Sequence, residues 1–154
     1  MDPREEFRRH FRPAVTVGAA LVVSLALYLG LVEALRAALR PFRGFAPGGG
    51  GPSPRYAVFG AAAAVILAIL VLRRRFDRSD GRKEGPAAGL RRLQTWAVLF
   101  LVLGEVPAVL GLGLFLVRGE ASDFYKLLFA SLLLTFINFP RAPAWEEWLN
   151  GGQS

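Results

Sequence analysis

The chain has 154 residues, of which 53% are hydrophobic, and this length leaves little room for two ordinary domains. It contains no cysteine and a single histidine, which excludes a disulfide framework, a thiolate nucleophile and a histidine pair for metal or haem. The formal net charge of +7 would suggest nucleic-acid binding in a soluble protein, but here the arginines flank long apolar runs. We therefore predict an all-α integral membrane protein that is not an enzyme and uses no cofactor, metal or nucleic acid.

The first apolar run covers residues 14–32, and at 1.5 Å per residue it nearly spans a hydrocarbon core of about 30 Å. We predict a transmembrane helix over residues 14–38. A cleaved secretory signal is the alternative interpretation. The segment before the run mixes acids with its arginines, and no small-residue cleavage site follows it cleanly, so we favour a retained helix.

Three further apolar runs follow along the chain. They predict helices over about 56–73, 93–117 and 124–139. The last of these is short, and Lys126 has to extend toward the headgroups for that helix to span the bilayer. Together the four runs predict a bundle of four transmembrane helices that forms one membrane domain over residues 1–154.

Arginine and tryptophan residues flank the runs at positions that suit the lipid interface. Those predicted to lie there are Arg73, Arg74, Arg75, Arg91, Arg92, Trp145 and Trp148. The basic loop over residues 73–92 either contacts anionic lipid or an acidic partner, or only fixes the topology, and we favour the second interpretation. The loop over residues 44–54 holds four consecutive glycines between prolines, which predicts a flexible linker.

The distribution of positive charge predicts the orientation. With four spans, 13 Lys and Arg residues fall on the side of the termini and the 73–92 loop, and 6 fall on the other side. Because positively charged loops stay in the cytoplasm, we predict cytoplasmic N and C termini in a bacterial inner membrane.

Small residues at helical spacing predict where helices approach closely, because association within lipid depends on close contact. The predicted helix-packing residues are Ala57, Gly60, Ala61, Ala64 and Ala68 on the second helix and Gly104, Ala108 and Gly111 on the third. A looser stripe on the first helix consists of Ala19, Ala26, Gly30 and Ala34. Packing within the chain and packing against other subunits both remain open for these faces.

Glu105 lies at the middle of the third run, where an ionised carboxylate costs at least about 2.5 kcal/mol. No basic residue lies at comparable depth in the other runs, so we expect Glu105 to keep its proton or to pair with another chain. Pro107 follows and should kink the helix. The two residues form either a proton or ion site or a hydrogen-bonded packing contact. Glu33, by contrast, suits an interfacial ion pair with Arg36.

The stretch LRRLQTWAVLFLVLGEVPAVLGLGLFLV, residues 90–117, resembles the ion-carrying helix of the c subunit, or proteolipid, of rotary ATP synthases. The resemblance places Glu105 at the ion-binding carboxylate, Pro107 at the nearby proline, and Gly111 and Gly113 at the later glycines. It implies a hairpin formed by the second and third helices, with a cytoplasmic loop. The chain is also similar to small bacterial four-helix membrane proteins with an acid-containing third helix.

These observations favour a noncatalytic membrane subunit that packs in a larger inner-membrane protein assembly. The alternative is proteolipid-like translocation of protons or cations through a homo-oligomer, with Glu105 as the cycling carboxyl. A small transporter or lipid-binding protein is a third class, although four short helices with one polar midplane residue give a monomer a poor solute pathway. The expected partners are anionic lipid headgroups and other membrane subunits or further copies of the chain.

Overall fold

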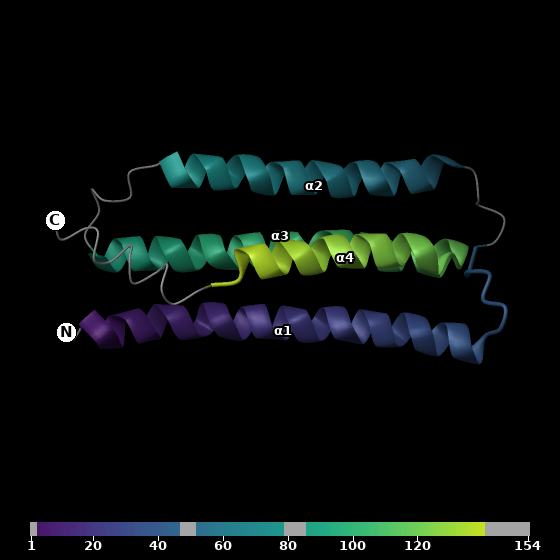
Figure 1. Cartoon of the computed structure of the whole chain (residues 1–154), viewed down its shortest axis with the longest axis horizontal. Helices are drawn as coiled ribbons and strands as arrows, with labels where there is room; N and C mark the ends of the chain where they lie inside the picture. Colours follow the sequence, from purple (N-terminus) through teal and green to yellow (C-terminus); the bar gives the residue numbers. More distant parts are fainter. Residues whose placement is uncertain (1–2, 47–51, 79–85, 141–154) are drawn as a thin grey trace.

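The computed structural model describes residues 3–46, 52–78 and 86–140, and its only regular secondary structure there is helical. The four helices are α1 (Pro3–Ala38), α2 (Pro52–Arg78), α3 (Pro86–Arg118) and α4 (Ala121–Asn138). Consecutive helices run in opposite directions along a common axis, so α1 and α3 begin at the end of the bundle where α2 and α4 finish (Figure 1). The predicted all-α class is confirmed.

The first three helices are longer than the apolar runs that predicted them. Each begins at a proline, which is favoured in the first helical turn because its missing N–H has no intrahelical partner there. The charged residues beyond the apolar runs, including Arg73, remain within the helices. The helices therefore project past their apolar stretches at the end of the bundle that holds the start of α1.

Three helices in the described part of the chain are long and apolar enough to cross a membrane. They are α1 over Arg8–Ala38, α2 over Pro54–Arg75 and α3 over Ala88–Arg118. Helix α4 is not among these candidate membrane-spanning helices. It has 18 residues, and Asp123 and Lys126 lie within its first two turns. At 1.5 Å per residue it is about 27 Å long, slightly less than a typical hydrocarbon core.

Helix α3 is the centre of the bundle and contacts α1, α2 and α4 (Figure 1). One cluster of buried residues lies between α1, α3 and α4 and includes Leu25, Phe115 and Phe124. A second cluster joins α2 to α3 and α4 through Ile69, Phe100 and Leu134. Helix α2 is the least enclosed, since 11% of its apolar stretch is buried inside the chain, against 44% for α3.

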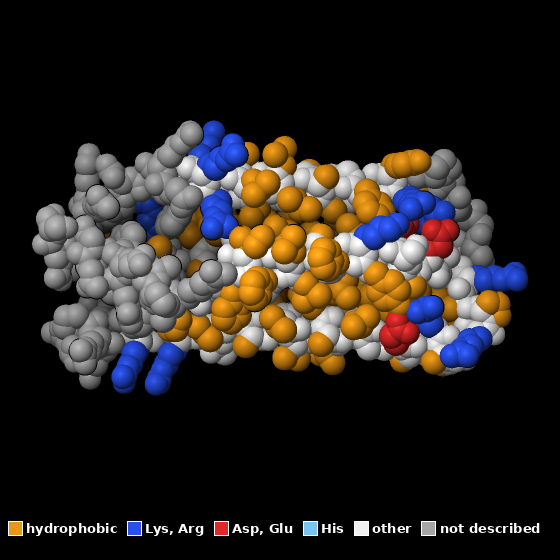
Figure 2. All heavy atoms as spheres, in the orientation of Figure 1, with side chains coloured by type: hydrophobic (Ala, Val, Ile, Leu, Met, Phe, Trp, Pro, Cys, Tyr) orange, Lys and Arg blue, Asp and Glu red, His pale blue; other side chains and the backbone are white. Residues whose placement is uncertain are grey.

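The outer surface of the bundle is apolar over its middle. Figure 2 shows hydrophobic side chains covering the central part of one face, with Lys and Arg side chains gathered toward the two ends. Large exposed hydrophobic residues occur on all four helices, among them Leu27, Leu67, Val102 and Phe136. A continuous apolar belt of this kind suits a lipid environment, which agrees with a membrane protein.

The chain after α1 folds back onto the end of α3. The N–H of Phe45 donates to the carbonyl of Leu116 at 2.8 Å, and the N–H of Ala46 donates to that of Val117 at 3.3 Å. Residues 44–46 are therefore held against α3 and residues 52–54 belong to α2, so the predicted flexible linker over 44–54 was too long. Its remaining part, residues 47–51, lies outside the described residues.

Candidate functional site

The carboxyl group of Glu105 faces α1 from the middle of α3. Its Oε1 accepts a hydrogen bond from Ser24 Oγ at 2.5 Å and another from Tyr28 Oη at 2.8 Å. Ser24 and Tyr28 are four residues apart, so one face of α1 presents both hydroxyl groups. These two bonds tie α1 to α3 at the centre of the apolar region.

The two oxygens of this carboxyl group have different surroundings. Both hydroxyl groups donate to Oε1, while Oε2 makes no hydrogen bond with any residue the structure describes. No described Lys or Arg forms an ion pair with Glu105 either. The carboxyl group is thus an acceptor in a contact between helices, and this contact uses one of its two oxygens.

Pro107 is buried, and α3 continues through it. Ser131 of α4 lies beside this position. The N–H of Ala108 donates to Ser131 Oγ at 2.8 Å, and that hydroxyl lies 3.5 Å from the carbonyl oxygen of Glu105. A buried hydroxyl group from α4 therefore bonds to the backbone of α3 next to the proline.

The small residues on α3 lie against α4. Gly104, Ala108 and Gly111 are all buried. A Cβ added at Gly111 would lie 2.9 Å from Leu127 Cβ and 3.4 Å from Phe124 Cα, closer than ordinary packing allows. The two backbones approach each other closely because residue 111 has no side chain.

The small residues on α2 are exposed in the part of the chain that the structure describes. Ala57, Gly60, Ala61, Ala64 and Ala68 are all exposed, and a Cβ added at Gly60 would meet no atom within 4 Å. We call these five residues the open face of α2. The buried residues of this helix, Ala62 and Ile69, lie on a different side of it.

The predicted stripe of small residues on α1 is also exposed. Its four residues are all exposed; they are Ala19, Ala26, Gly30 and Ala34. The glycine of α1 that packs closely is Gly18, which the sequence did not single out. A Cβ added there would lie 2.8 Å from Phe139 Cε2 at the end of α4. Close packing of α1 therefore depends on a position outside the predicted stripe.

The predicted interface arginines gather at one end of the bundle. The end of α2 carries Arg73, Arg74 and Arg75, all exposed, and the start of α3 carries Arg91, exposed, and Arg92, half-buried. Because α1 also begins at this end, its first arginines join them (Figure 1). Trp145 and Trp148, and residues 79–85 of the predicted basic loop, lie outside the described residues.

Ion pairs between described residues occur at the opposite end of the bundle. Arg36 Nη1 lies 3.2 Å from Glu33 Oε1, which confirms the predicted ion pair. Tyr125 of α4 extends this contact, since its hydroxyl group donates to Glu33 and accepts a hydrogen bond from Arg36 at 2.7 Å. The pair thus forms part of a link between α1 and α4.

Asp123, which the sequence analysis did not single out, is completely buried in the first turn of α4. Arg55 of α2 donates from Nη2 to Asp123 Oδ1 at 2.9 Å, and its Nε lies 2.8 Å from Oδ2 without hydrogen-bond alignment. Lys126 donates to Oδ1 at 3.3 Å. A carboxylate near a helix N-terminus is also stabilised by the helix dipole. Asp123 therefore ties the start of α2 to α4.

Among the described residues, no group of three or more His, Asp or Glu side chains could hold a metal ion.

Comparison with known proteins identifies no relative of this chain. A scan against known protein families finds no match, and comparisons with curated proteins and with solved structures find none either. Function is therefore inferred from the side chains and surfaces described above.

Proposed function

We propose that this chain is a noncatalytic integral membrane subunit that packs in a larger protein assembly of a bacterial inner membrane. All four helices lie within the bilayer in this proposal, with the short α4 packed along α3. Both termini and the loop over residues 73–92 face the cytoplasm. The gathering of arginines at that end supports this orientation, because positively charged segments remain on the cytoplasmic side.

The open face of α2 is the observation that carries the proposal. On α3, a stripe of the same kind lets the α4 backbone approach closely, whereas the stripe on α2 is exposed among the described residues. Lipid chains gain little from a surface of alanine and glycine, because Leu, Ile, Phe and Val are the residues that favour contact with hydrocarbon. Small residues instead favour another helix at short distance.

The weak attachment of α2 supports the same conclusion. Its contacts within the chain run mainly along α3, and most of its apolar stretch is left uncovered. A helix held on one side and carrying a small-residue face on another is suited to contact two neighbours. We therefore place the partner subunit on the open face of α2.

Purification of the tagged full-length chain from its native membranes in mild detergent tests this proposal. The expected result is a set of unrelated membrane proteins that elute with it at fixed stoichiometry. Elution as a monomer, or as copies of the chain alone, would contradict the proposal.

A second candidate function is proton or cation translocation through a homo-oligomer, with Glu105 as the cycling carboxyl. The observation that favours it is the Oε2 atom, which lacks a hydrogen bond from any described residue. Resemblance of residues 90–117 to the ion-carrying helix of proteolipids supports the same residue.

Labelling with dicyclohexylcarbodiimide distinguishes this candidate, because the reagent attacks protonated carboxyl groups in apolar surroundings. Translocation predicts labelling of the wild-type chain in native membranes that falls as pH rises and is lost in Glu105→Gln. Glu33→Gln, which changes an exposed carboxyl group, serves as the control and should keep the labelling. Absence of label on Glu105 would eliminate the cycling role.

A further inference from the structure

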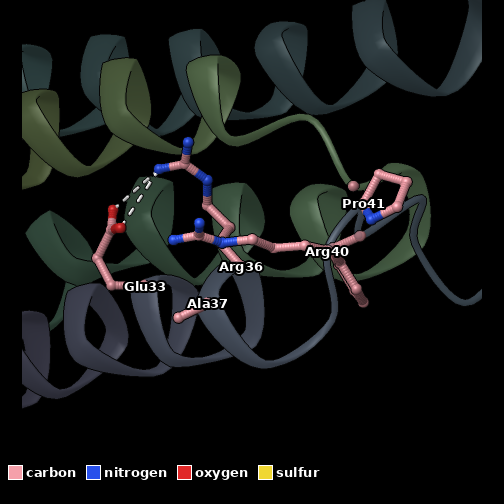
Figure 3. Close-up of a pocket in the computed structure, with 7 residues that line it drawn as sticks. Glu33, Arg36, Ala37, Arg40 and Pro41 are labelled. Atoms are coloured by element: carbon pink, nitrogen blue, oxygen red, sulfur yellow. Dashed lines mark hydrogen bonds and ion pairs between the residues drawn. The ribbon is translucent and has the colours of Figure 1, made fainter.

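A hollow of about 340 Å³ lies at the C-terminal end of α1, open to the surface. Its wall is formed by Glu33 and Arg36 of α1, and the chain that follows the helix contributes Arg40, Pro41 and Phe42. Figure 3 shows the side chain of Arg40 reaching back along α1 toward Arg36. Arg36 lies in the last turn of α1, whereas Arg40 follows the end of the helix, and both residues line the hollow.

The charges around this hollow do not cancel. Arg36 bonds to Glu33 and to the hydroxyl group of Tyr125, and all of these bonds use Nη1. Arg40 has neither an ion pair nor a hydrogen bond with any residue the structure describes. Two guanidinium groups thus face one carboxylate, and that carboxylate already accepts bonds from Arg36 and Tyr125. The excess positive charge favours an anion.

The walls of the hollow are held in place by the backbone. Gly119 lines it with φ of 77°, in the left-handed region that glycine adopts most readily. A Cβ at this position would lie 2.6 Å from the carbonyl oxygen of Phe42, so the turn after α3 presses directly on the chain after α1. The ring of Phe42 packs on Phe115 with centroids 5.0 Å apart. The arginines therefore border a preformed hollow.

The hollow lies just past the apolar run of α1, a position that suits contact with lipid phosphates. The uncharged apolar run of α1 ends at Val32, and Glu33, Arg36 and Arg40 follow it. When the apolar part of α1 fills the hydrocarbon core, the hollow reaches the headgroup region. A guanidinium group matches phosphate because its N–H donors are arranged as a planar fork.

We propose that this hollow binds a phosphate group, carried by the headgroup of an anionic phospholipid. Arg40 supplies the free donors, Arg36 adds charge, and Pro41 and Phe42 contact the apolar part of the headgroup. Free inorganic phosphate offers the same chemistry and is the other source to be tested. The proposal concerns a lipid site and does not depend on the assembly inferred above.

Native mass spectrometry of the purified full chain tests this site. The chain is equilibrated in detergent with phosphatidylglycerol and, separately, with phosphatidylcholine, whose choline group cancels the phosphate charge. We expect one phosphatidylglycerol molecule to be retained preferentially by the wild type. Arg40→Gln should lower its affinity about tenfold, since a hydrogen bond to a charged group is lost. Arg43→Gln is the matched control, because Arg43 is exposed on the same segment but does not line the hollow.

Addition of inorganic phosphate separates the two sources. Retention of phosphatidylglycerol in the presence of phosphate supports the lipid as ligand, whereas displacement by millimolar phosphate supports a site for free phosphate. Equal binding by wild type, Arg40→Gln and Arg43→Gln would overturn the proposal, and so would the absence of binding by the wild type. If Arg40→Gln does not fold, Ala37→Phe fills the hollow without a change of charge, and it should abolish the same binding.

Discussion

Helices α2 and α3 each carry a stripe of small residues, and among the described residues the stripe on α3 is buried while the stripe on α2 is exposed. On α3, Gly104, Ala108 and Gly111 are buried against α4. On α2, Gly60 and the four alanines of the open face are exposed, and a Cβ added at Gly60 would meet no atom within 4 Å. The same local pattern therefore produces a closed interface in one place and an open surface in another.

The difference arises from the positions of the two helices. The turn between α3 and α4 is short, so these helices become immediate antiparallel neighbours with matching polar groups, as at Ser131. Helix α2 lies at the edge of the bundle and rests on α3 through larger residues such as Ile69. The small-residue pattern thus marks a potential for close contact, and the topology decides whether the chain itself satisfies it.

The largest expected effect comes from filling the closed interface. Gly111→Leu should destabilise the bundle by about 3 kcal/mol, because the new side chain overlaps Leu127 and forces α3 away from α4. Thermal unfolding in detergent, followed by circular dichroism, measures this. Gly113→Leu is the control, because a Cβ there meets no atom within 4 Å. Similar losses in both variants would show that the α3–α4 contact is not close.

The attachment of α2 can be weakened without touching its open face. Arg55→Gln should cost about 2 kcal/mol, since Asp123 is fully buried and would keep only Lys126 as a cationic partner. Lys126→Gln should cost less, because Lys126 is the more exposed of the two cations and lies farther from the carboxylate. Thermal unfolding in detergent compares the losses of stability in the two variants. A larger loss for Lys126→Gln would contradict the role given to Arg55.

The contact at Glu105 should contribute least. Glu105→Leu removes the acceptor of the Ser24 and Tyr28 hydroxyl groups and should cost about 1 kcal/mol, as expected for hydrogen bonds between membrane helices. Glu105→Gln keeps an oxygen acceptor and should be nearly neutral. Unfolding measurements on the two variants would reject the packing role if their stabilities were equal.

The arrangement of apolar runs predicted much of this fold. It identified all four helices, and it failed at their ends because charged residues such as Arg74 do not interrupt a helix in water or among headgroups. It also placed Glu105 near the middle of the third helix, and helical spacing alone predicted the Glu33–Arg36 ion pair. Local sequence was sufficient for these features because they depend on neighbours within one helix.

Contacts between helices were harder to predict. Ser24, Glu105 and Ser131 each lie near the middle of their apolar runs, so matching their depths would have indicated that they meet. The burial of Asp123 had no such signal, because it depends on an arginine at the start of another helix. Which side of α2 is covered likewise depends on how α2 rests on α3, and a repeating pattern within α2 carries no information about that.

The central claim is that the open face of α2 binds a partner subunit, and a matched pair of variants tests it most directly. Ala64 belongs to this face, whereas Ala63 is also exposed but lies outside it. We predict that Ala64→Leu lowers the amount of partner that copurifies about tenfold, because the added side chain keeps the helices apart, with no change in thermal stability. Ala63→Leu should copurify like the wild type. Unchanged copurification with Ala64→Leu would contradict the account.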